Sequence, residues 1–230
     1  MTMNKTNSGA HYGFTQYCYP RDYELSGKRF ELKEGADTFI LDFQDREFVS
    51  CTDDNGECLS QYEALKLDDR THIVFFGECI TTAVLDLENG YAVLSDPKGT
   101  RYSFCEISGM QQKGRRPGYT GDMTGTHVRW YFGNERYLEN TYNEDGTCTC
   151  IWSPRTDRKR TISAQYIRVK DGIYLCQLDS TSPFRSDIPQ GFSKIIMLQS
   201  YEHLETVGCI YSPALNEWRL ISGYAMPPEA

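Results

Sequence analysis

The stretch GTHVRWYFGNERYLENTYNEDG, residues 125–146, places a tight turn between two strand-like runs rich in aromatic residues. Side chains along the first run fall into two alternating sets: Val128, Trp130 and Phe132 on one side, and His127, Arg129 and Tyr131 on the other. Two such runs joined by a short turn are typical of a β-hairpin. We expect the apolar set to line a barrel pocket, with His127 and Arg129 outside or packed between barrels.

The same period of two continues along the rest of the chain. Short runs such as RFEL (29–32), TFILDF (38–43) and THIVFF (71–76) are separated by turn signals, among them Asn89-Gly90. No long stretch shows the period of 3.6 residues that marks an amphipathic helix. The pattern predicts an all-β protein with no helix longer than about three turns.

The pattern occurs twice. SQYEALKLDDRTHIVFF at 60–76 parallels SAQYIRVKDGIYLCQL at 163–178, so we predict a tandem duplication. Each copy has about eight short strands, enough to close a small antiparallel barrel around side chains or one small ligand. A single larger barrel or sandwich built from both halves is the alternative.

This interpretation divides the chain into four parts. They are an aromatic N-terminal extension at 1–24, packed against a barrel mouth, a first barrel at 25–108, a glycine- and lysine-rich linker at 109–122, and a second barrel at 123–230.

The composition of the chain restricts the classes of partner that we expect for it. The formal net charge of −8 and the sequence pI near 5.1 argue against non-specific binding to nucleic acid or to anionic membrane surfaces. No apolar run approaches the ~18 residues of a membrane span, and the N-terminus lacks the apolar core of a signal peptide, so we expect a cytoplasmic protein. The nine cysteines are then expected to be reduced, with Cys148 and Cys150 serving core packing. We expect no metal site and no cofactor.

Five segments of the chain carry a resemblance to the MoaF family. They are LSGKRFEL (25–32), SQYEALKLDDRTHIVFFGE (60–78) and TTAVLDLENGYAVL (81–94) for its N-terminal half, and GTHVRWYFGNERYLENTY (125–142) and YIRVKDGIYLCQLDS (166–180) for its C-terminal half. The resemblance covers roughly residues 25–224 and implies two tandem calycin/lipocalin-like antiparallel β-barrels. The molybdenum-cofactor role in the family's name has no chemical support here, because the chain lacks a glycine-rich phosphate loop and a cysteine or metal signature.

The second half also resembles phenolic acid decarboxylases. The two tyrosines that hold the substrate carboxylate in those barrels correspond here to Trp130 and Phe132, and their proton-donating glutamate corresponds to Ser180. An arginine, Arg158 or Arg160, lies near the expected place. Since both tyrosines and the acid are replaced, the second barrel is not expected to perform that reaction in the same way.

Carried through the internal repeat, the resemblance places the glutamate position on Glu78 and the position of Tyr174 on His72. His72, Val74, Phe76 and Glu78 then share one strand face. If that face points inward, burial would raise the pKa of a carboxyl and lower that of an imidazole, which gives an acid–base pair. The alternatives are that the face points outward, or that the strand ends before Glu78.

Two sets of candidate residues follow. The catalytic candidates are Glu78, His72 and Tyr62, and the ligand-binding candidates are Phe76, Trp130, Phe132, Tyr166 and Tyr174. Tyr62 and Tyr166 occupy corresponding places in the two copies, and a buried tyrosine whose hydroxyl bonds to the backbone is the alternative for both.

The favoured function is a cofactor-independent lyase, isomerase or cyclase. It would act by acid–base catalysis on a small aromatic or carbonyl-bearing metabolite of a biosynthetic pathway. The alternatives are a non-catalytic carrier or sensor of such a ligand and a protein-interaction scaffold. The partners expected are a small apolar or aromatic ligand and, as an open alternative, a second copy of the chain in a homodimer.

Overall fold

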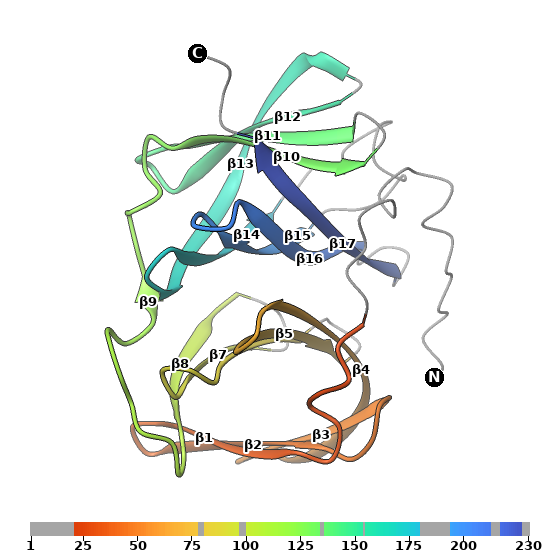
Figure 1. Cartoon of the computed structure of the whole chain (residues 1–230), viewed down its shortest axis with the longest axis vertical. Helices are drawn as coiled ribbons and strands as arrows, with labels where there is room; N and C mark the ends of the chain where they lie inside the picture. The colour runs from red at the N-terminus through yellow and green to blue at the C-terminus, as the bar shows by residue number, and fades with distance from the viewer. Residues whose placement is uncertain are drawn as a thin grey trace. The chain divides into compact units, whose positions relative to one another are not determined.

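The computed structural model is all-β. It describes residues 21–77, 81–96, 100–133, 136–153, 155–179, 194–212 and 217–226. These described residues form strands and turns with no helix, as the period of two predicts. The predicted fold class is confirmed: the chain forms two closed, antiparallel, eight-stranded β-barrels in tandem (Figure 1).

The first barrel follows the order of the sequence. Its strands are β1 (Arg29–Glu34), β2 (Asp37–Phe43), β3 (Phe48–Asp53), β4 (Gly56–Asp68), β5 (Thr71–Phe76), β6 (Thr81–Asp86), β7 (Tyr91–Ser95) and β8 (Tyr102–Ile107). Each strand pairs antiparallel with the next, and β1 pairs with β8 through Leu32 and Ile107. That last pairing closes the sheet and removes its edges.

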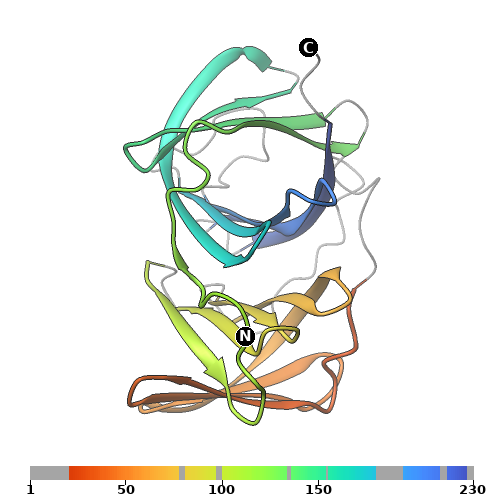
Figure 2. The same ribbon diagram turned by 60° about the vertical axis from the view of Figure 1, so that its left-hand side comes forward.

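The second barrel repeats the arrangement. Its strands are β10 (His127–Gly133), β11 (Arg136–Tyr142), β12 (Thr147–Trp152), β13 (Arg155–Lys170), β14 (Ile173–Asp179), β15 (Lys194–Ser200), β16 (Glu205–Ser212) and β17 (Glu217–Met226). β10 pairs with both β11 and β17, and pairing of β12 with β13 completes the ring (Figure 2). The order β10 to β17 thus matches β1 to β8 strand for strand, which supports the predicted duplication.

The chain divides into two compact units near Gly118. One unit contains 21–118 with 169–171, and the other contains 119–168 with the described residues from 172 onward. The predicted linker at 109–122 contains a short strand, β9 (Gly118–Tyr119), which joins the second sheet beside β13. Of the predicted N-terminal extension, residues 1–20 lie outside the described residues.

Strand alternation builds a separate core in each barrel. Inward side chains of the first barrel include Leu32, Leu41, Phe43, Val74, Phe76 and Leu85, and those of the second include Trp130, Phe132, Leu138, Cys176, Met197 and Ile221. Most of these side chains are fully removed from solvent. The interior of each barrel is therefore lined largely by its own apolar face, and any polar group pointing inward enters a low-dielectric interior.

Candidate functional site

His72 faces the interior of the first barrel. It lies on β5 two residues before Val74, and both Val74 and Phe76 belong to the apolar core. Because alternate residues of a strand share a face, the imidazole points inward with them. Its register neighbours are Lys66 on β4 and Leu85 on β6, and its side chain is only 1% exposed.

The partner of His72 is Asp22. Nδ1 of His72 is hydrogen-bonded to Oδ2 of Asp22, whose side chain is 3% exposed. The Asp22 backbone N–H donates to the carbonyl of Ala64 on β4 at 2.9 Å, and Leu25, three residues later, is fully buried in the barrel core. The segment before β1 is thus anchored to β4 and delivers a carboxylate to the imidazole.

Asp22 is held in its ionised form. Burial, the largest influence, raises the pKa of Asp22, but hydrogen bonds from His72 and the Glu24 N–H, with the charges of His72 and Lys66, outweigh it. The resulting pKa lies below its ordinary value of 3.8. In the neutral state of the ring, the carboxylate on Nδ1 places the ring proton on that nitrogen, so Nε2 carries the lone pair that can accept a second proton. This is the arrangement of a base oriented by a carboxylate.

The depressed pKa of Asp22 predicts an acid-dependent loss of stability. A group of this kind stabilises the fold above its unfolded pKa of about 3.9, and the contribution is lost as pH falls through the lower folded pKa. We expect the urea midpoint of the wild type to exceed that of Asp22→Asn at about pH 5, and the gap to narrow toward about pH 3. Asp69→Asn is the control, because the side chain of Asp69 is 98% exposed. A difference in urea midpoint between the wild type and Asp22→Asn that does not change with pH would contradict the expectation.

Glu78, the predicted partner of His72, lies outside the described residues. Its role remains a prediction, while Asp22 is a partner that the sequence analysis missed. The two residues of the dyad are 50 positions apart, and Asp22 stands in a segment that shows no alternation.

The tyrosines Tyr62 and Tyr166 occupy equivalent positions and make equivalent contacts. The hydroxyl of Tyr62 donates to the carbonyl of Asp45 at 2.9 Å, and that of Tyr166 donates to the carbonyl of Thr147 at 2.7 Å. Burial raises the pKa of Tyr62 to about 12 and that of Tyr166 further. These contacts match the alternative of a buried tyrosine bonded to the backbone, and they argue against Tyr62 as a proton carrier near neutral pH.

Trp130 and Phe132 on β10 point into the second barrel, as the alternation predicts. Trp130 and Phe132 are fully buried, and Trp130 contacts Tyr201 edge to face, with ring centres 5.8 Å apart. Tyr174 packs against the same core, with its ring centre 5.7 Å from that of Tyr201. The predicted ligand-binding residues Trp130, Phe132 and Tyr174 thus belong to one aromatic cluster.

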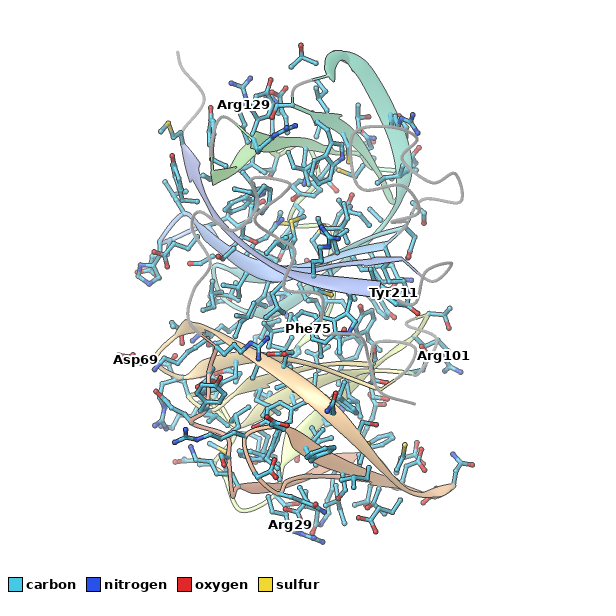
Figure 3. All side chains as sticks on the ribbon, turned by 90° about the vertical axis from the view of Figure 1, so that its right-hand side faces the viewer. Arg29, Asp69, Phe75, Arg101, Arg129 and Tyr211 are labelled. Carbon is cyan, nitrogen blue, oxygen red and sulfur yellow. The ribbon has the colours of Figure 1, made fainter. Side chains whose placement is uncertain are left out.

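The opposite face of β10 is polar and exposed. Arg129, labelled in Figure 3, donates to Glu139 on β11 at 2.6 Å, and His127 lies 2.9 Å from the same carboxylate. Both side chains leave close to half of their surface in solvent. His127 and Arg129 therefore lie on the outside of the barrel, as expected.

A polar cluster inside the second barrel was not predicted. Asn140 and Tyr142 on β11 and Gln199 on β15 are fully or almost fully buried, and Tyr201 packs beside them. Tyr142 donates its hydroxyl to Oε1 of Gln199 at 3.0 Å, which joins two strands that are not neighbours in the sheet. Asn140 could have been noticed, because it interrupts the apolar face formed by Leu138 and Tyr142.

The buried thiols are poor candidates for chemistry. Sγ of Cys148 lies 3.5 Å from Sγ of Cys150, and Cys176 is buried in the same core. The hydrogen bond to Cys148 and burial raise the pKa of Cys150, and burial raises that of Cys176, so both thiols stay protonated. Within the described ranges no group of three or more His, Cys, Asp or Glu side chains could hold a metal ion.

Comparison with known proteins adds no assignment. No protein-family model and no curated protein sequence matches the chain. Among the described residues, no helix is both long and apolar enough to cross a membrane. The resemblance to the MoaF family therefore stays a prediction.

Proposed function

We propose that the first barrel is the active site of a cofactor-independent lyase, isomerase or cyclase. The observation that carries the proposal is the His72–Asp22 pair, an imidazole oriented by a carboxylate inside an otherwise apolar barrel. Its substrate would be a small aromatic or carbonyl-bearing metabolite, which suits the apolar interior and the aromatic ring of Phe76.

Proton transfer is the only step that the protein itself must perform, since the electron pair left by the departing proton forms the new bond within the substrate and expels any leaving group. His72 would take a proton from carbon next to a carbonyl through Nε2, while Asp22 stabilises the imidazolium through Nδ1. The same proton then returns to another atom of the substrate in an isomerisation or cyclisation, or to a leaving group in an elimination. The enzyme ends each cycle in its starting state, so no cofactor is consumed.

The apolar interior favours this reaction over one in water. A dry interior strengthens the electrostatic interaction between Asp22 and a developing imidazolium, because little solvent screens it. Fixing both partners on the barrel also lowers the entropic barrier, since the base needs no search for its orientation. A MoaF-like, cytoplasmic enzyme with an aromatic metabolite as its ligand is the proposal in full.

The competing function is a carrier or sensor of the same class of ligand. It differs in one observable: a carrier returns its ligand unchanged. We would screen benzoate, cinnamate, benzaldehyde and acetophenone derivatives by thermal shift, then incubate each stabilising compound with the protein and analyse the mixture by mass spectrometry and NMR. A new or isomerised product, formed in proportion to enzyme, supports the proposal. Stabilising compounds that all survive unchanged would favour the carrier.

A further inference from the structure

The interior of the second barrel contains a hydrogen-bond network that the chemistry proposed for the first barrel does not use. Tyr142 donates its hydroxyl to Oε1 of Gln199 at 3.0 Å, and Tyr201 donates to the same oxygen at 3.3 Å. Asn140 donates through Nδ2 to the Tyr142 hydroxyl oxygen at 3.3 Å. Since the Tyr142 hydrogen is already used on Gln199, its oxygen can only accept from Asn140, and this fixes the orientation of the Asn140 amide.

That orientation leaves Oδ1 of Asn140 without a hydrogen-bond partner in the described part of the chain, and Nε1 of Trp130 in the same barrel also lacks one there. Oδ1 of Asn140 and Nε1 of Trp130 are fully buried and have no hydrogen-bond partner among the described residues. The strand neighbours of Asn140 are Val128 and Cys150, and the thiol of Cys150 is directed to Cys148. Buried polar atoms in folded proteins nearly always have a partner. Asn140 therefore offers one acceptor, and Trp130 one donor, inside this barrel.

We propose that the second barrel binds a small neutral aromatic molecule that carries both a hydrogen-bond acceptor and a donor. The acceptor of the ligand pairs with the Trp130 indole N–H, and its donor pairs with Oδ1 of Asn140. Primary aromatic amides have this pair of groups. This site is separate from the His72–Asp22 pair and stands whether or not the first barrel is catalytic.

The surroundings explain the choice of ligand class. The ring of Tyr201 meets those of Trp130 and Tyr174 edge to face, and a further aromatic ring would extend the same packing. A carboxylate is disfavoured at Asn140, because its oxygens would face the Asn140 carbonyl oxygen with no hydrogen between them. An amide presents N–H at that point and C=O to the indole.

The test uses benzamide as the probe and the indole N–H signal of Trp130 as the reporter. The chain has three tryptophans, so its ¹H–¹⁵N spectrum contains three indole signals, and Trp130→Phe removes one of them and assigns it. Titrating benzamide into the full-length wild type should shift the Trp130 signal saturably. Acetophenone, which lacks the donor, should bind roughly ten-fold more weakly.

Variants separate the site from non-specific binding. Asn140→Leu removes the acceptor at similar volume and should weaken benzamide binding roughly ten-fold or more. Thr141→Val, on the opposite face of the same strand, should leave it unchanged. If a variant fails to fold, sequential assignment of the wild type still identifies the Trp130 signal.

Three results would overturn the proposal. One is a Trp130 indole signal that benzamide does not shift, which would mean that trapped water, and no ligand, hydrogen-bonds to Asn140 Oδ1 and Trp130 Nε1. Another is an equal affinity for benzamide and acetophenone, both measured from the shift of the Trp130 signal. The last is benzamide binding that His72→Gln abolishes and Asn140→Leu does not affect, because it would place the ligand in the first barrel. The expected shift, with no product found for any first-barrel compound, would support this site while contradicting the proposed enzyme.

Discussion

Replacing His72 with glutamine is expected to lower turnover of the first-barrel substrate by ~10²–10⁴-fold. Glutamine fills a similar volume and can still hydrogen-bond to Asp22, but it cannot accept and return a proton near neutral pH. The imidazole is 1% exposed and is hydrogen-bonded to a carboxylate inside an apolar core. We therefore expect the substitution to slow the proton-transfer step. The measurement is the steady-state rate for the compound that the product screen identifies, with the melting temperature as a folding check.

Two further variants make this result specific. Asp22→Asn should also lower the rate, because an amide cannot stabilise the imidazolium by charge. Ile73→Val alters the opposite face of β5 by one methyl group and should keep turnover close to the wild type. A folded His72→Gln protein with wild-type turnover would contradict the role of the dyad.

Glu78 supplies the remaining comparison. Sequence reasoning pairs His72 with Glu78, whereas the structure pairs it with Asp22. If Glu78→Gln loses turnover and Asp22→Asn keeps it, the pairing inferred from the resemblance is the functional one. If the two variants behave in the opposite way, the N-terminal segment supplies the catalytic partner.

The fold could be predicted because local rules determine it. The alternation around Trp130 and Phe132 predicts both that the segment is a β-strand and which of its side chains point inward. One period of two residues indicates both. The similarity between residues 60–76 and residues 163–178 then predicts two copies of the same barrel. No long-range contact is needed for either step, and the strand pairings of both barrels agree with them.

The site depends on contacts that no local rule predicts. Asp22 reaches His72 because its segment hydrogen-bonds to Ala64 and buries Leu25. Both contacts depend on the path of the chain before β1, which no local sequence pattern determines. Gln199 lies in a run, KIIMLQS, that is buried on both faces, so alternation cannot say which face points inward. The hydrogen bond from Tyr142 that makes Gln199 part of a network crosses the barrel interior.

Gly208 also escapes sequence reasoning, yet its environment leaves no room for a side chain. It lies within β16, opposite Met197 on β15 and Ile221 on β17. A Cβ atom built on Gly208 would overlap with the carbonyl oxygen of Ile196. It would also lie 2.9 Å from Cα of Met197, which is too close for two carbon atoms. Both obstacles are backbone, so a side-chain rotation cannot relieve them.

Gly208→Ala is therefore expected to destabilise the protein by at least about 3 kcal/mol, at the upper end of overpacking substitutions. To admit the methyl group, the backbone of β15 must move away from β16, which breaks ladder hydrogen bonds in a closed barrel whose other strands cannot follow. Gly118→Ala is the matched control, because a Cβ there meets no atom within 4 Å, and its effect should stay within about 1 kcal/mol. Urea unfolding of both variants measures the difference. A Gly208→Ala protein as stable as the wild type would show that β15 and β16 approach less closely than this geometry requires.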